Sequence, residues 1–281
     1  MQPFGISRTV HTVRWPQVSE ILAGMIGSDF YANLRERKLI SARIDQLGSQ
    51  TRDWLSPVVD LAGFPHAYHV NGIHHAIEQW LASETRPICC LRGEYPYPSH
   101  MRRGMLIVDK VIDIPSDHVV FISNPFSASG KFDERYGLIN NPTVLDLAYV
   151  GTTAAHRIAI SDNTEQVFWS GSKTFGIGTF RTGVRFTRRA DNLQDQLRDT
   201  GYFNWFGIEL LSRCMGLWSV FDAHAMLYER YATICQDHGL SASDTYLLAT
   251  STDTRYAHLR REDGTMRIPT GLLLDDLWSL R

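Results

Sequence analysis

Lys173 stands in a setting where a lysine could act as a nucleophile. It is one of only four lysines in the 281-residue chain, and it follows a predicted strand at 166–169 among small hydroxyl and glycine residues. A lysine ammonium must lose its proton before it attacks an aldehyde, and partial burial favours that loss. The small neighbours leave room for a cofactor ring, and the Arg181 guanidinium suits a phosphate. The pattern predicts a Schiff base on Lys173 and not a nucleotide-binding P-loop, because that loop needs glycines where this chain has Val167 and Ser172.

Other polar side chains follow predicted strands upstream of the lysine. Asn124 comes directly after the strand at 119–123, Asp146 ends the strand at 143–146, and Tyr149 follows it closely. In sheets of parallel strands, ligands bind beyond the carboxyl ends of the strands. We therefore expect these three side chains to face the same pocket as the lysine.

The lysine segment resembles that of the fold type I pyridoxal-phosphate enzymes, the aspartate aminotransferase superfamily. Ser170, Lys173, Arg181 and Gly183 have the spacing of that family's signature, which runs from Ser-x-x-Lys through a glycine-rich stretch to Arg-x-Gly. The segment departs from the strict pattern at Gly171, Thr179 and Thr182.

Two upstream segments carry the same resemblance. Residues 124–130 match the length of the family's Asn-Pro-x-Asn-Pro-x-Gly stretch and keep its first Asn-Pro and its glycine, with Ser127-Ala128 in place of the second Asn-Pro. Asp146 and Tyr149 have the spacing of the family's Asp-x-x-Tyr pair. The resemblance spans about residues 65–275 of this chain.

The resemblance implies a pyridoxal 5'-phosphate cofactor and three catalytic residues, Lys173, Tyr149 and Asp146. Lys173 would hold the cofactor and move the proton on the substrate's Cα, while Asp146 would keep the pyridine nitrogen protonated. Tyr149 and Asn124 would bond the cofactor's phenolic oxygen. Arg267, in the tail, would bind the α-carboxylate of an amino-acid substrate.

The other implied cofactor-binding residues surround the phosphate and the ring. Asn71-Gly72-Ile73 opens a predicted helix after a strand, so its backbone N–H groups could bind the phosphate. Tyr97 resembles the family's aromatic residue that stacks on the ring, and Tyr95 is an open alternative. The remaining phosphate-side candidates are Ser170, Ser172 and Arg181. Three histidines that could line the pocket receive no role: His74, His75 and His100.

The resemblance also implies the architecture. We expect an α/β protein with the fold type I arrangement, in which residues 60–205 form a large domain around a mixed, mostly parallel seven-stranded sheet between helices. Residues 1–59 and 206–281 would form a reduced α+β small domain. The chain would be an unusually short member of the family and a homodimer with shared active sites.

The most favoured function is an aminotransferase in specialised biosynthesis. Because the same carbanion chemistry allows other outcomes, a lyase, replacement or cyclisation enzyme acting on an amino acid is an alternative. A non-catalytic relative that acts as a binding module is a second alternative, although retention of Lys173, Asp146 and Arg181 argues against it.

Short apolar runs alternating with helical periodicity support an α/β fold. Helices are predicted at 16–34, 73–81 and 204–236. Strands are predicted at 67–70, 88–91, 105–108, 119–123, 143–146, 166–169 and 183–186, and in the tail at 246–249 and from Met266.

The composition argues against several classes of protein. With 28 Lys+Arg against 30 Asp+Glu, the net charge of −2 does not suit nucleic-acid binding. No apolar run approaches the roughly 20 residues that span a bilayer, and the start resembles no signal peptide. The four cysteines form no zinc-site spacing. We expect a cytoplasmic protein with free thiols, and with no metal, nucleic acid or membrane as a partner.

Overall fold

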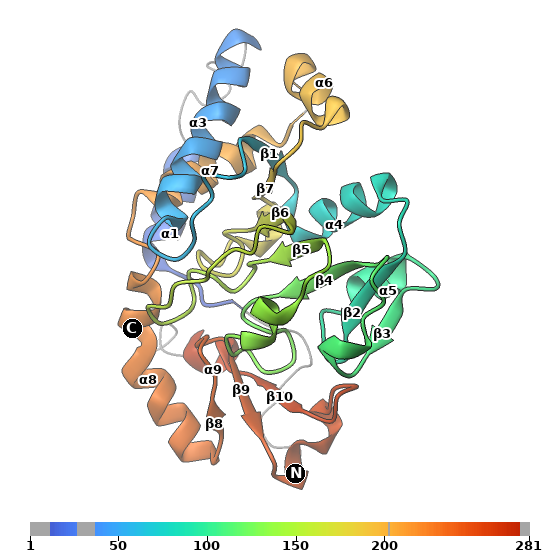
Figure 1. The fold of residues 1–281 in the computed structure, drawn as a ribbon. Helices are drawn as coiled ribbons and strands as arrows, with labels where there is room; N and C mark the ends of the chain where they lie inside the picture. The colour runs from blue at the N-terminus through green and yellow to red at the C-terminus, as the bar shows by residue number, and fades with distance from the viewer. Residues whose placement is uncertain (1–11, 27–36, 202, 276–281) are drawn as a thin grey trace.

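The computed structural model describes residues 12–26, 37–201 and 203–275 (Figure 1). Seven strands form the main sheet in the order β1-β7-β6-β5-β4-β2-β3. Only β7 runs antiparallel to its neighbours, so the predicted mixed, mostly parallel sheet is confirmed. The strands are β1 (His66–Val70), β2 (Ile88–Leu91), β3 (Leu106–Val108), β4 (Val119–Ser123), β5 (Thr143–Asp146), β6 (Thr164–Trp169) and β7 (Gly183–Thr187).

Both faces of this sheet are buried. Along β4, Val119 and Phe121 pack in the cluster that contains Trp80 of α4 (Gly72–Ser83), whereas Val120 and Ile122 pack in the larger cluster on the other side. Successive side chains of a strand point to opposite faces, so an unbroken apolar run is what a strand covered on both faces requires. This explains why these strands read as continuous apolar segments in the sequence.

The face of the sheet that carries the larger cluster is covered by helices from distant parts of the chain. α3 (Arg37–Leu55) packs on β1, on α6 (Asn192–Thr200) and on α7 (Trp205–Met215), and α1 (Pro16–Ile26) also packs on α7. The short α5 (Tyr97–Met101) follows β2 and contacts α4 (Figure 1). No helix in the described ranges is long and apolar enough to cross a membrane.

A second, antiparallel sheet is built from the C-terminal part of the chain. Its order is β10-β9-β8, with β8 (Ser241–Ala242), β9 (Leu248–Ser251) and β10 (Met266–Pro269). α8 (Asp222–His238) contacts β8 and the short α9 (Gly271–Asp275). The predicted boundaries of the two domains, 1–59 and 206–281 against 60–205, stay a prediction.

The single helix predicted at 204–236 is wrong, because two helices occupy this segment. α7 ends at Met215, and α8 begins at Asp222. The Asp222 carboxylate accepts a hydrogen bond from the Ser219 backbone N–H at 2.7 Å, in the turn that precedes α8. The helix predicted at 16–34 begins as expected at Pro16, and its part beyond Ile26 lies outside the described residues.

The segment before α1 packs against the loop that follows Lys173. The Trp15 indole N–H donates to the Thr174 carbonyl at 2.9 Å. Gly176 has a φ of +68°, and a Cβ added there would lie 2.3 Å from the Val13 carbonyl oxygen. This close approach of two backbone segments requires glycine.

We predict that Gly176→Ala lowers the free energy of unfolding by about 2–4 kcal/mol, because it combines a left-handed backbone with a steric overlap. Urea unfolding measures the change. Gly178→Ala is the matched control, since a Cβ at Gly178 meets nothing within 4 Å. Equal stability of the two variants would contradict the packing described here.

Candidate active site

A cavity of about 440 Å³ lies at the carboxyl ends of the central strands. It brings together side chains from β5, from the segments after β2, β4 and β6, from the start of α4 and from β10. Eight residues predicted from the sequence line it: Ile73, Asp146, Tyr149, Ser170, Ser172, Lys173, Arg181 and Arg267. Four other predicted residues are not among its lining residues in the described chain: Asn71, Gly72, Tyr97 and Asn124.

Asp146 is a buried carboxylate at the end of β5. Only 3% of the residue is exposed, and one carboxylate oxygen accepts a hydrogen bond from the Ala148 backbone N–H at 2.8 Å. Burial raises the pKa of Asp146 to about 6, against the opposing effects of the Lys173 charge and of this hydrogen bond. A buried carboxylate facing a cavity suits a partner that is itself a hydrogen-bond donor or a cation.

Lys173 reaches the cavity from the turn after β6. Its Nζ lies 4.3 Å from the centre of the Tyr149 ring, a cation–π contact. Among the described residues, this ammonium forms no ion pair with Asp146. The turn is held by the Ser170 hydroxyl, which donates to the Thr182 carbonyl at 2.7 Å and lies 2.8 Å from the Ser172 hydroxyl.

Arg181 lies against the first residue of α4. It has a φ of 48°, in the left-handed region, and its guanidinium would lie 3.0 Å from a Cβ added at Gly72. The helix has no side-chain cap from Asn71, so the N–H groups of its first turn are not satisfied in that way. A guanidinium beside a helix N-terminus is an arrangement that binds phosphate.

The structure places Tyr95, and not Tyr97, in the cavity wall. The His74 ring is hydrogen-bonded through Nε2 to the Tyr95 hydroxyl and stacks on Tyr97 with 4.1 Å between ring centres. The Tyr97 hydroxyl instead donates to Glu78. The sequence left Tyr95 and Tyr97 open, because both stand in the same Tyr-Pro-Tyr segment, and it gave His74 no role because no paired motif accompanies that histidine.

Asn124 is buried, and its backbone is hydrogen-bonded to that of Asp146 on the neighbouring strand. Its N–H donates to the Asp146 carbonyl at 3.0 Å, and its side-chain oxygen accepts from the Asp133 N–H at 3.1 Å. The preceding Ser123 lies in register with Asp146. Asn124 thus lies beside Asp146 on the adjoining chain segment.

Glu94 and Arg261 were not identified from the sequence. The Glu94 carboxylate accepts hydrogen bonds from the Ser123 N–H at 2.8 Å and hydroxyl at 2.7 Å, and from the Tyr95 N–H at 2.9 Å. Burial raises the pKa of Glu94 to about 8, with these hydrogen bonds opposing. Arg261 lines the cavity beside Arg267. No periodic signal marks either residue, although Glu94 follows the apolar strand β2 by only three residues, where the polar side chains of such a site are expected.

Comparison with known proteins shows the fold of this chain. No protein-family model matches the sequence, and no curated protein matches it either. Among solved structures, it is similar to a histidinol-phosphate aminotransferase from Sinorhizobium meliloti in complex with pyridoxal-5'-phosphate, with 14% identity over 97% of this chain and 90% of that one and a TM-score of 0.68.

Two further solved structures are also similar to this chain over nearly its whole length. A probable N-succinyldiaminopimelate aminotransferase from Thermus thermophilus shares 15% identity over 98% of this chain and 92% of that one, with a TM-score of 0.69. A tyrosine aminotransferase from Leishmania infantum shares 13% identity over 99% and 93%, with a TM-score of 0.61. The chain therefore has the fold type I architecture of aminotransferases, which confirms the predicted fold class.

We predict that Asp146→Asn stabilises the cofactor-free protein at pH 7.5 by about 2–3 kcal/mol. Folding raises the pKa of Asp146 from 3.8 to about 6. The folded state therefore binds more protons than the unfolded state between these values, so this group's contribution to stability falls as the pH rises through them and stays low above pH 6. At pH 3.5 the variant should gain little.

Urea unfolding of the cofactor-free protein at both pH values measures this difference. Asp109→Asn is the control, because Asp109 is an exposed partner of Arg92, and such surface pairs contribute little to stability. If Asp146→Asn lowers the free energy of unfolding at pH 7.5, the charged carboxylate does not destabilise the folded state and the prediction is wrong.

Proposed function

We propose that the chain is a pyridoxal-phosphate-dependent enzyme that acts on an amino acid, and that its reaction is transamination. The observation that carries the proposal is the meeting of Lys173, Asp146, Tyr149 and Arg181 in one cavity. These four lie at or next to the ends of three neighbouring strands, β5, β6 and β7, and packing alone does not require a lysine and a buried carboxylate to face the same cavity.

The residues present fit the cofactor. Lys173 and Asp146 approach the cavity from different strands and form no ion pair with each other in the described chain, which leaves room between them. Arg181 and the start of α4 would bind the phosphate, and Tyr95 would cover one face of the ring. When bound, pyridoxal phosphate supplies an aldehyde for a lysine and a ring that accepts electrons from the substrate.

Each side chain has a defined task in this proposal. Asp146 would accept a hydrogen bond from the protonated ring nitrogen and keep the proton there. Tyr149, whose ring contacts the Lys173 ammonium, would donate its hydroxyl proton in a hydrogen bond to the cofactor's phenolic oxygen. Lys173, as a free amine, would take the proton from the substrate's Cα and deliver it to the cofactor carbon on the other side of the substrate nitrogen. Arg267 binds the α-carboxylate, and its guanidinium is already oriented by a bond to the Ser127 carbonyl at 2.8 Å.

Other parts of the sequence-based expectation stay predictions. These are the homodimer with shared sites, the location in the cytoplasm and a role in specialised biosynthesis. The alternative reactions on an amino acid, elimination, replacement or cyclisation, use the same cofactor residues and are separated from transamination by the product formed.

We predict that the protein purified with pyridoxal phosphate has a visible absorbance band that Lys173→Ala abolishes. Borohydride reduction followed by peptide mass spectrometry should find the cofactor on the peptide that contains Lys173. Lys131→Ala is the control and should retain the band and the adduct. A cofactor adduct spread over several lysines, or a band unchanged in Lys173→Ala, contradicts the proposal.

For the reaction type, we predict that an amino-acid donor converts the bound cofactor to its amine form, with the matching 2-oxo acid released in equal amount. Absorbance and chromatography of the released acid measure both. Release of ammonia or of a side-chain leaving group, with the cofactor unchanged after turnover, would assign the site to elimination or replacement instead.

A further inference from the structure

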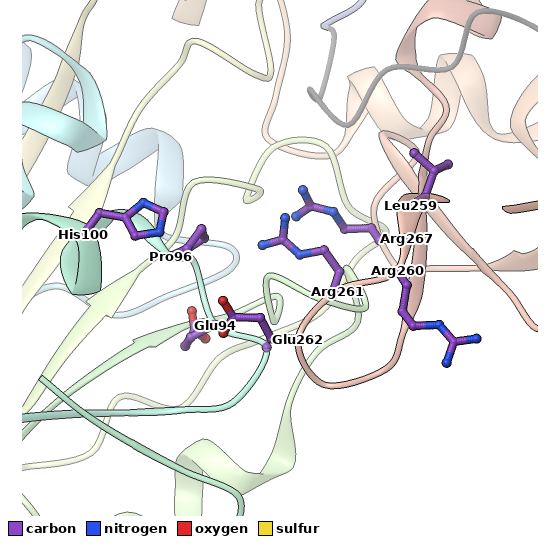
Figure 2. A pocket seen from close by; sticks show the side chains of 9 residues that line it. Glu94, Pro96, His100, Leu259, Arg260, Arg261, Glu262 and Arg267 are labelled. Carbon is purple, nitrogen blue, oxygen red and sulfur yellow. The ribbon is translucent and has the colours of Figure 1, made fainter. Parts of the chain in front are cut away.

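Tyr95, which lines the main cavity, is held at both ends by neighbouring side chains. It lies between Glu94 and Pro96, which line an adjoining pocket of about 180 Å³ (Figure 2). The Glu94 carboxylate accepts a hydrogen bond from the Tyr95 backbone N–H at 2.9 Å. At the far end of the side chain, the Tyr95 hydroxyl is hydrogen-bonded to Nε2 of His74. The first contact fixes the backbone of Tyr95, and the second fixes the direction of its ring.

His74 is itself packed from its other side. Its ring stacks on Tyr97 with 4.1 Å between the ring centres and 15° between the ring planes. The Tyr97 hydroxyl donates to Glu78, which follows His74 by one turn of α4. The imidazole lies between its own helix and the first residue of α5, so it has little side-chain freedom left to lose when it holds Tyr95.

The surroundings of His74 favour an uncharged imidazole. Burial lowers the pKa of His74 below its ordinary value of 6.5. The charges of Arg181 and Lys173 act in the same direction, while the charge of Glu78 opposes them. A neutral imidazole offers an acceptor nitrogen, and the Tyr95 hydroxyl keeps its proton because burial raises its pKa to about 12. His74 is therefore suited to a hydrogen bond with Tyr95 and poorly suited to act as a cation for the cofactor's phosphate.

We propose that His74 is a positioning residue, which holds the Tyr95 ring in the direction in which it covers the cofactor ring. His74 stands in the first turn of α4, two residues after Gly72, and the N–H groups of that turn are the ones proposed to bind the phosphate. One segment thus serves both ends of the cofactor, with its backbone at the phosphate and its imidazole, through Tyr95, at the ring. The inference rests on the proposed function and adds a residue to the same site.

The test compares how the cofactor-free protein binds two ligands, pyridoxal phosphate and inorganic phosphate. The visible absorbance of pyridoxal phosphate measures the first affinity, and competition against it measures the second. Inorganic phosphate reports on Arg181 and the start of α4, whereas pyridoxal phosphate also reports on Tyr95. His74→Phe keeps a ring stacked on Tyr97 and removes the hydrogen bond. We expect it to weaken pyridoxal phosphate binding about 3- to 10-fold and to leave inorganic phosphate binding unchanged.

Further variants separate the hydrogen bond from packing. Tyr95→Phe should have the same effect as His74→Phe, and the double variant should be no worse than either, because the two groups act as one pair. His74→Gln can still bond the Tyr95 hydroxyl, so it should recover part of the affinity. The visible circular dichroism of the bound cofactor should change in each variant that loses the bond. His156→Phe is the control, since it replaces an exposed imidazole that stacks on Phe132 at 3.8 Å, and it should change neither measurement.

Equal losses of pyridoxal phosphate and inorganic phosphate binding in His74→Phe overturn the inference, because His74 would then act at the phosphate. Losses that add in the double variant also overturn it, as does a circular dichroism spectrum that His74→Phe leaves unchanged. If the cofactor attaches to Lys173 and His74→Phe binds it like the unmodified protein, the inference fails alone. If no adduct forms on Lys173 in the unmodified protein, the proposed function fails and the inference fails with it.

Discussion

The candidate site depends on the attraction between two opposite charges, Asp146 and Lys173, which face one cavity without forming an ion pair among the described residues. Each is fixed by its own segment, Asp146 by β5 and the Ala148 N–H, and Lys173 by the turn after β6 and the Tyr149 ring. The lysine lowers the cost of burying the carboxylate but does not remove it, since the pKa of Asp146 stays above its ordinary value. The strands therefore hold open a space that collapse into an ion pair would close.

The phosphate side of the cavity depends on backbone conformations that few residues adopt. Arg181 and Gly72 both have positive φ, and together they let a guanidinium lie directly on the start of a helix. For arginine this conformation costs free energy, which the surrounding hydrogen bonds must offset. The Asn204 side chain donates to the Phe180 and Arg181 carbonyls at 2.8 and 3.2 Å and so holds this turn from outside the sheet.

Most of the sheet and the residues around Lys173 could be predicted from sequence, because strand ends and motif spacing are local properties. Asp146 falls at the end of β5 as expected. The break between α7 and α8 was missed, since the apolar periodicity continues through the turn and Phe221, the residue before α8, is not a typical capping residue. The choice of Tyr95 over Tyr97, and the presence of Arg261, depend on how α5 and the turn before β10 pack against the sheet, which no local pattern reports.

The two ends of the described chain are joined over the loop that carries the lysine. The Arg14 N–H and guanidinium both donate to the Asp275 carboxylate, at 2.8 and 2.6 Å, across 261 positions of sequence. Val13 and Trp15, beside Arg14, are the residues that cover Gly176 and Thr174. Because Asp275 is made long after Arg14, this contact over the loop can form only once nearly all of the described chain has been synthesised.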